Sequence, residues 1–204
     1  MLNEEHAKSL VNKILKLSPA RATEILLKYQ NIALTRFANN HIIQNVAEDN
    51  LNISIRVLHQ DKMGRAETNK TDSDALVNCC ERALQLAKFS APDPNTLPLP
   101  GRQSYESTNS FYENTYAFNA ESRARHVNEM IRLCQDKNAN LAGIHKIAAS
   151  SIAIGNSQGL FAFSKSSHAA SSVTAAINGK TGGNIIDEAA RHKFSSNNRK
   201  QDNR

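Results

Sequence analysis

Residues 51–58 read Leu-Asn-Ile-Ser-Ile-Arg-Val-Leu, with the period of two that places four apolar side chains on one face of a β-strand. Three further apolar-rich runs precede this one, at residues 23–30, 32–37 and 41–47. Turn-forming residues separate the runs at 39–40 and 48–50 and follow the last one at 61–64. Short strands joined by tight polar turns predict an antiparallel meander, because parallel strands need long crossover connections.

Two helices are predicted on either side of these strands. Residues 3–17 have apolar side chains at helical spacing, and Ser18-Pro19 ends the pattern. The second helix begins at Thr71 or Asp72, either of which can cap it, and has an apolar stripe formed by Leu76, Val77, Cys80, Ala83, Leu84 and Ala87. Adjacent Cys79 and Cys80 lie about 100° apart on a helix, so at most one is expected to face the core. We interpret them as small packed thiols and not as a reactive pair.

Four of the five prolines lie between residues 91 and 101. Proline fixes φ and biases the preceding residue to extended conformations, so this stretch is predicted to be a stiff surface linker. Beyond it the pattern of strands and helices repeats. We expect extended chain at 110–118, a helix at 120–137 capped by Asn119, a turn at 155–159, and strands at 141–154, 160–164 and 168–177.

The predicted fold class is therefore α+β, with two small domains that each combine antiparallel strands and packed helices. The expected boundaries are an N-terminal domain at 1–91, a proline-rich linker at 92–110, a second domain at 111–186 and a basic tail at 187–204. That tail is polar and has little to bury, so we expect it to be disordered.

Composition narrows the classes of function. The net charge is +6 over 204 residues, but five basic groups and one acidic group lie in residues 191–204, which leaves +2 for the rest. This tail has no interleaved aromatic residues, so nucleic acid is not an expected partner. No apolar run approaches the ~18–20 residues of a membrane helix, and the acidic start is unlike a signal peptide. Three cysteines fit a reducing compartment, and we expect a cytoplasmic protein.

Short motifs give no self-contained active site. His126 with Glu129 and Glu188 with His192 have the helical spacing of metal ligands, but neither pair has a third ligand nearby in sequence. Gly179-Lys180-Thr181 resembles the end of a phosphate-binding loop, yet Thr174 stands where that loop needs glycine. Serines between 164 and 172 lack the Gly-x-Ser-x-Gly pattern. The histidines at 41, 59, 145 and 168 are expected to be packed or edge residues. No catalytic, cofactor-binding or metal-binding residue is predicted in this chain.

A longer resemblance is more specific. Leu34-Thr35-Arg36-Phe37-Ala38-Asn39-Asn40, followed by His41-Ile42-Ile43-Gln44-Asn45-Val46, resembles the N-terminal signature of the TldD/PmbA family. The resemblance continues through residues 51–57, 64–69, 75–87 and 91–94. In the second half, residues 153–162 (Ala-Ile-Gly-Asn-Ser-Gln-Gly-Leu-Phe-Ala) resemble the hairpin of that family, and residues 171–176 the strand after it. Both motifs need left-handed backbone angles, which Asn39, Asn40, Gly155 and Gly159 tolerate. The resemblance covers roughly residues 10–178.

This resemblance implies a dimeric zinc metallopeptidase whose HExxxH helix and distant cysteine lie in the second half of a chain about twice as long. It also implies that the first half takes part in dimerisation and walls the chamber that admits an extended peptide. Some members of the family lack the zinc helix and act as partners of one that has it. Members are linked to maturation of a modified peptide antibiotic, turnover of an antitoxin and modulation of DNA gyrase.

The similarity fades after Ile177, and this sequence has no HExxxH motif. We therefore expect the non-catalytic N-terminal part of a metallopeptidase, truncated before the zinc site, with no cofactor of its own and no activity alone. Its expected partners are itself or a longer TldD/PmbA-type subunit, together with an extended peptide, and not a membrane. One alternative is a free-standing peptide- or nucleic-acid-binding module without enzymatic activity. Another is a vestigial fragment that exposes apolar surface.

Overall fold

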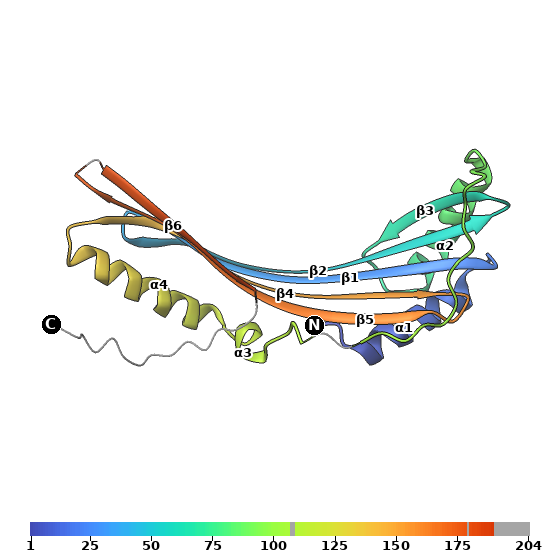
Figure 1. Ribbon diagram of the computed structural model, residues 1–204, viewed down its shortest axis with the longest axis horizontal. Coiled ribbons are helices and arrows are strands. Elements are labelled where there is room, and N and C mark those ends of the chain that lie inside the picture. The colour runs from blue at the N-terminus through green and yellow to red at the C-terminus, as the bar shows by residue number, and fades with distance from the viewer. Residues whose placement is uncertain (107–108, 179, 190–204) are drawn as a thin grey trace. The chain divides into compact units, whose positions relative to one another are not determined.

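The computed structural model describes residues 1–106, 109–178 and 180–189, with the backbone alone for 184–189 (Figure 1). Six strands form one sheet in the order β3-β2-β1-β4-β5-β6. The elements follow one another as α1 (Glu4–Leu17), β1 (Ala22–Ala38), β2 (His41–His59), β3 (Lys62–Thr68), α2 (Ser73–Phe89), α3 (Glu113–Tyr116), α4 (Ala120–Gln135), β4 (Asn140–Asn156), β5 (Phe161–Ile177) and β6 (Lys180–Ala189). The α+β fold class is confirmed.

The strands are longer than the sequence pattern predicted. The runs at 23–30 and 32–37 lie in the single strand β1, and the runs at 41–47 and 51–58 lie in β2. The turn expected at 48–50 is wrong, because Asp49 is bridged to β1 by hydrogen bonds from Tyr29 and Asn31 while the strand continues. In the same way, the expected break between 164 and 168 lies inside β5.

Two predicted tight turns are confirmed by their backbone angles. Asn39 and Asn40 have φ values of 50° and 60°, in the left-handed region that asparagine tolerates. Gly159 has a φ of +85° in the turn between β4 and β5. Gly155 was expected to share that conformation, but it belongs to β4 and has no positive φ. Glycine is needed at this position for close packing instead, since an added Cβ would overlap the Val11 side chain.

Helix α2 begins as predicted, with the Asp72 side chain accepting a hydrogen bond from the Ala75 N–H at 2.9 Å. The expectation that at most one of the adjacent cysteines faces the core is wrong, because Cys79 and Cys80 are 4% and 0% exposed. Helix α2 contacts both β3 and α1, so it is covered over a wider arc than one sheet face provides.

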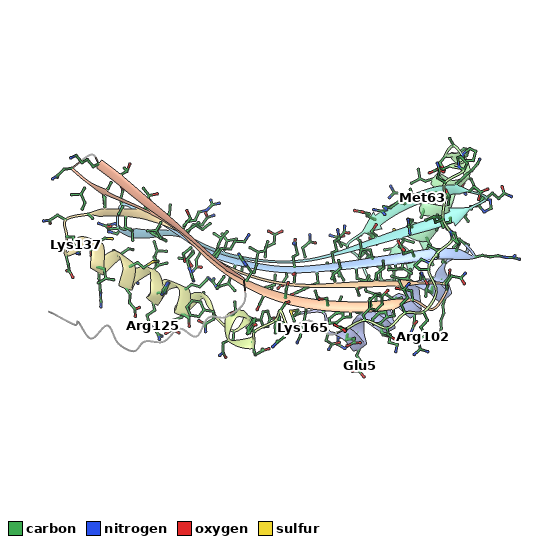
Figure 2. The ribbon with its side chains drawn as sticks, in the orientation of Figure 1. Glu5, Met63, Arg102, Arg125, Lys137 and Lys165 are labelled. Atoms are coloured by element: carbon green, nitrogen blue, oxygen red, sulfur yellow. The ribbon has the colours of Figure 1, made fainter. Side chains whose placement is uncertain are left out.

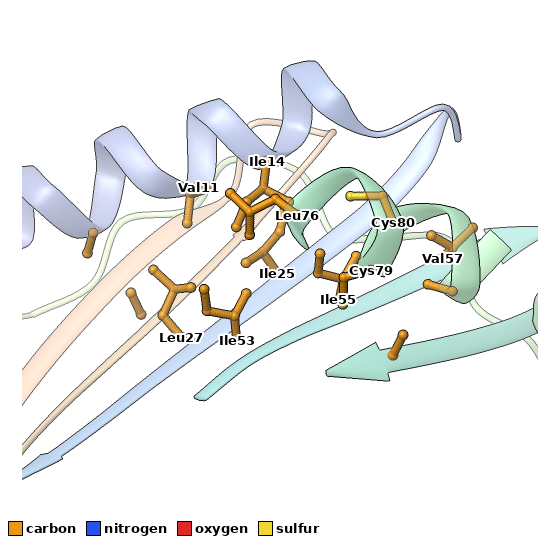
Figure 3. Close-up of a cluster of buried hydrophobic side chains, with 14 of the residues drawn as sticks. Val11, Ile14, Ile25, Leu27, Ile53, Ile55, Val57, Leu76, Cys79 and Cys80 are labelled. Carbon is orange, nitrogen blue, oxygen red and sulfur yellow. The ribbon is translucent and has the colours of Figure 1, made fainter. Parts of the chain in front are cut away.

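The first hydrophobic core consists of Ala7, Val11, Ile14, Ile25, Leu27, Ile53, Ile55, Val57, Ala66, Leu76, Cys79, Cys80, Ala83, Ala87 and Ala153. Figure 3 shows most of this cluster, including Val11, Ile25 and Leu76, between α1, α2 and the strands. A second, smaller core is formed by Phe37, Val127, Ile131 and Leu141. Both cores follow the sequence pattern: alternate strand residues and one stripe of each helix are buried.

The compact units of the structure differ from the sequential domains that were expected. Unit 1 comprises residues 1–32, 47–109 and 149–166, and unit 2 comprises 33–46, 110–148 and the residues from 167 onward. The proline-rich stretch lies within unit 1, where Asp93 N–H donates to Asp61 O at 2.8 Å and Asn156 Nδ2 to Pro100 O at 2.8 Å. Strands β1, β2, β4 and β5 each contribute residues to both units.

Three smaller expectations also change. The segment 110–118 is not wholly extended, since it contains the short helix α3. Helix α4 starts after the predicted cap Asn119 and ends at Gln135. Residues 187–189 of the expected tail belong to β6, while the remainder of the tail lies outside the described residues. No described helix is long and apolar enough to span a membrane.

Candidate functional site

The metal-ligand pairs suggested by spacing do not form a site in the described part of the chain. No group of three or more His, Cys, Asp or Glu side chains lies close enough there to hold a metal ion. Glu129 is exposed on α4, whereas the His126 ring lies against Phe118 and His145. The side chain of Glu188 and all of His192 lie outside the described residues, as does Gly179 of the phosphate-loop-like motif.

The structure brings together one histidine–serine pair that the sequence did not indicate. His145 Nδ1 and Ser171 Oγ are 2.6 Å apart, on neighbouring strands β4 and β5. The ring centroids of His145 and His126 are 5.0 Å apart, and Phe118 packs edge-on against His145. His145 is only 2% exposed. Because the His145 ring is buried and Ser171 is half-buried, we interpret the pair as a structural link between the two strands.

The feature best suited to binding is the outer edge of β2. Strand β3 pairs with β2 only over residues 53–59. Residues 41–46 in unit 2 and 47–52 in unit 1 have no strand beside them on that side within the described ranges. All of residues 43–50 are exposed. An unpaired strand edge carries main-chain N–H and C=O groups that another extended chain can pair with.

The corresponding edge of β5 is covered instead. Strand β6 pairs with β5 from His168 to Ile177. Just before that stretch, Ser167 N–H donates to Ser110 O at 3.0 Å, and Tyr112 N–H donates to Ser167 Oγ at 2.8 Å. The chain itself therefore occupies the β5 edge at this point, whereas no strand among the described residues pairs with the outer edge of β2 at 41–46 or at 47–52.

A buried arginine holds the unit 2 part of the open strand. Arg123 on α4 is 4% exposed, and its Nη2 donates to Asn45 Oδ1 at 3.0 Å. Its Nη1 donates to Phe118 O at 3.1 Å, and Nε lies 3.4 Å from Thr35 Oγ1. Burial lowers the pKa of Arg123 from its ordinary value. By contrast, the Glu121–Arg125 pair of the same helix is exposed to solvent (Figure 2).

A second polar cluster holds the unit 1 part of the strand. Tyr29 OH donates to Asp49 Oδ1, and Asn31 Nδ2 donates to the same oxygen at 2.8 Å. These two hydrogen bonds, that of Tyr29 first, hold the pKa of Asp49 below its ordinary value. Asp49 is exposed, so it stays charged on the open edge at neutral pH.

The stretch that resembles the family signature includes Asn45 but ends at Val46, before Asp49, and no pattern in the sequence explained either polar residue. Asn45 lies 78 positions before Arg123, and Asp49 lies 20 after Tyr29. No local spacing rule joins residues this far apart in the chain. The only signal was the polar character of residues 44–50, which was interpreted in part as a turn.

This chain resembles known proteins in part of its sequence and in its fold. Residues 24–87 match the sequence profile described as PmbA/TldA metallopeptidase domain 1. Among solved structures, TldE from Thermococcus kodakarensis superposes with a TM-score of 0.75 at 17% identity, over 90% of this chain and 43% of that one. A Thermotoga maritima protein described as a modulator of DNA gyrase gives a TM-score of 0.75 at 17% identity, over 96% of this chain and 45% of that one.

A third similar structure is a Bacteroides thetaiotaomicron protein that is also described as a modulator of DNA gyrase. Its TM-score is 0.67 at 13% identity, over 91% of this chain and 45% of that one. None of the curated proteins matches the chain by sequence. The chain thus has the fold of these proteins and spans less than half of their length.

Proposed function

We propose that this chain, whose residues 24–87 match the first domain of the PmbA/TldA metallopeptidases, is the non-catalytic N-terminal part of a TldD/PmbA-type metallopeptidase. In this role it walls the chamber that receives an extended peptide and pairs with a second subunit. The catalytic half is supplied by another polypeptide or by a continuation of the chain. The match of residues 24–87 to the first domain of the family carries this proposal.

The zinc of the family does not fit the residues described here. Structural and catalytic zinc sites use three or four His, Cys, Asp or Glu ligands. No such group is assembled among the described residues. We therefore assign no hydrolytic step to this chain, and its contribution is to hold the substrate and the partner.

The open edge of β2 supports a role in holding an extended chain. Main-chain hydrogen bonds from a strand edge give affinity for many sequences, because every peptide carries the same backbone groups. Polar clusters on both parts of the strand, around Asn45 and Asp49, keep it extended without a neighbour on its outer side. A chamber wall for varied peptides needs both properties.

Hydrogen exchange tests this proposal directly. An eight-residue extended peptide should slow amide exchange within residues 41–46 and leave 53–59 unchanged, because the latter already pair with β3. The matched control is the same peptide with N-methyl groups at alternate positions, which removes its donors on one edge. This control is made in two versions, each methylated on a different edge of the peptide. Only one of the two versions should fail to slow amide exchange. Protection that is equal for all three peptides, or absent, contradicts the proposal.

Zinc titration by calorimetry tests the non-catalytic part. We expect no binding of one zinc ion per chain with a dissociation constant below about 1 μM, since a site of that affinity needs an assembled ligand set. Such binding, together with cleavage of a test peptide that a chelator stops, would show that the chain is an enzyme by itself.

A further inference from the structure

Asn45 occupies an unusual position at the open edge. It is an exposed residue of the unpaired part of β2, yet its carboxamide oxygen is held by Arg123, a side chain that is only 4% exposed. Thr35 Oγ1 donates to the same oxygen at 3.0 Å. One end of an exposed side chain is therefore fixed by groups from β1 and α4, all within unit 2.

These contacts settle which way the carboxamide points. Arginine can only donate hydrogen bonds, so the Asn45 atom facing Arg123 must be the oxygen. The Nδ2 group then has two N–H bonds to donate that Arg123 and Thr35 do not occupy. Within the described residues, no hydrogen-bond acceptor contacts Asn45 Nδ2. Asn45 thus presents a fixed pair of donors at a strand edge where a partner strand can lie.

The charge behind Asn45 makes these donors stronger. All the hydrogen-bond partners of Arg123 are neutral: Thr35 Oγ1, Phe118 O and Asn45 Oδ1. No carboxylate forms an ion pair with it in the described part of the chain. A buried cation polarises the amide that it contacts, and the field is weakly screened at low dielectric. An anionic acceptor beyond Nδ2 would complete the chain of hydrogen bonds.

We infer that the strand which pairs with residues 41–46 carries an Asp or Glu opposite Asn45, whose carboxylate accepts a hydrogen bond from Asn45 Nδ2. Side chains directly opposite in a strand pair have Cβ atoms about 4.5–5.5 Å apart, which is within reach of such a contact. This inference rests on the proposed function, because it names the partner of the same edge. The Arg123–Thr35–Asn45 triad, as we call these three residues, acts as a positioning device.

The preference for an acidic residue should be confined to one position of the pairing strand, the one opposite Asn45. Glu48 and Asp49 follow Asn45 by three and four residues and are exposed on the same strand. Carboxylates opposite them meet like charge, which is unfavourable in a cross-strand pair. Gln44 is held in a similar way, since its Oε1 accepts from Arg36 Nη1 at 3.1 Å, but Arg36 is exposed and solvent screens its charge. Gln44 also lies on the opposite face of the strand from Asn45, because side chains alternate. One acidic residue in a defined register is therefore expected, and not a generally acidic peptide.

An aspartate scan of a bound strand tests the inference on the full chain. The probes are eight-residue peptides of alternating Thr and Val with a terminal Lys, each with one residue changed to Asp or, as the matched control, to Leu. We expect one position, and its neighbour two along at most, to bind about three- to tenfold more tightly as Asp than as Leu. Fluorescence anisotropy of labelled peptides measures the dissociation constants.

The variants Asn45→Leu and Asn45→Asp separate the donor from the rest of the edge. Asn45→Leu should abolish the Asp preference. Asn45→Asp still accepts from Arg123 but presents an acceptor outward, so the preferred residue should change from Asp to Lys. Thr35→Val should weaken the preference without removing it, and circular dichroism melting checks that each variant folds.

The outcomes of the scan are distinguishable. Binding of all peptides with no position-dependent Asp preference overturns the inference and leaves the open edge in place. Absence of binding by every peptide overturns both the inference and the proposed function of the edge. Pairing of two copies of the chain through this edge, seen as a dimer whose formation Asn45→Leu does not affect, also contradicts the inference.

Discussion

Gly64 sets how closely α2 approaches the sheet. A Cβ at this position would lie far inside van der Waals contact with Ala83 O and Ala87 N of the helix backbone. Backbone atoms cannot rotate away as a flexible side chain does, so the helix would have to shift.

Gly64→Ala should therefore destabilise the fold by roughly 2–4 kcal/mol, as overpacking against rigid backbone does. Gly101→Ala is the matched control, because an added Cβ there meets nothing within 4 Å. Urea unfolding followed by circular dichroism measures both. Equal midpoints for the two variants would show that the helix has more space than the structure indicates.

The three thiols should differ in reactivity for a physical reason. Burial raises the pKa of Cys80 to about 11 and also raises that of Cys79, while Cys134 on α4 is only half-buried. A raised pKa means that the folded state favours the protonated thiol. The contribution of the two buried thiols to the free energy of unfolding is therefore fully present below the ordinary thiol pKa. It is lost as the pH rises toward 11.

At pH 8 an alkylating reagent should therefore modify only Cys134 rapidly in the native chain, and all three cysteines after unfolding. Intact-mass spectrometry counts the labels. The Cys134→Ser variant should show no rapid labelling while it is folded. Rapid double labelling of native protein at Cys79 and Cys80 would contradict their burial.

At the scale of elements, Asn156 organises the hairpin between β4 and β5. Its side chain is 2% exposed, and Oδ1 accepts from the Gln158 and Leu160 N–H groups at 2.9 and 3.1 Å. Next to it, Ser157 N–H donates to Thr23 O at the start of β1. The Asn-Ser-x-Gly motif thus joins the hairpin to β1 and, through Pro100 O, to the proline-rich segment.

Asn156→Ala should cost about 2–4 kcal/mol, since it removes three hydrogen bonds and leaves the buried Leu160 N–H without its acceptor. Asn156→Asp keeps the two accepted bonds but buries a carboxylate that faces Pro100 O, so at pH 7 it should cost at least as much as Asn156→Ala. Protonation of that carboxyl restores a donor, so the Asp variant should recover stability as the pH falls. Thermal melts at pH 7 and pH 4 compare the two variants, and an Asp variant clearly more stable than the Ala variant at pH 7 would contradict this ranking.

At the scale of the molecule, both units draw on the same four strands. β1, β2, β4 and β5 each run from one unit into the other, so unfolding of one unit frays strands that the other needs. This differs from two domains joined by a linker, which can unfold separately.

We therefore expect a single cooperative unfolding transition. The chain has no tryptophan, so one reporter can be introduced in each unit: Phe163→Trp in unit 1 and Phe118→Trp in unit 2. Within each variant, the urea midpoint measured by tryptophan fluorescence should coincide with the midpoint measured by circular dichroism. Any difference in midpoint between the two variants should then reflect only the effect of each substitution on overall stability. Well-separated transitions within one variant would instead show independent units.

The sequence by itself determined the three long helices, a cap at Thr71 or Asp72, the cap at Asn119 and the left-handed Asn39-Asn40 turn. It also carried the resemblance that the profile match over residues 24–87 supports. These depend on local periodicity, on capping and on side chains that tolerate unusual angles. It could not determine the length of the strands, because a polar run in a strand is indistinguishable from a turn until its partners are known. Asp49 shows this, since hydrogen bonds from Tyr29 and Asn31 keep it extended.

The tertiary structure decided the candidate site and the units. The open edge of β2 exists because β3 stops pairing at Ile53, which only strand registration reveals. The orientation of Asn45 depends on Arg123, a residue from another element that folding brings within 3.0 Å. Local rules act over a few residues, whereas strand pairing and burial join residues far apart in the chain, and therefore the fold alone could show which polar groups face a partner.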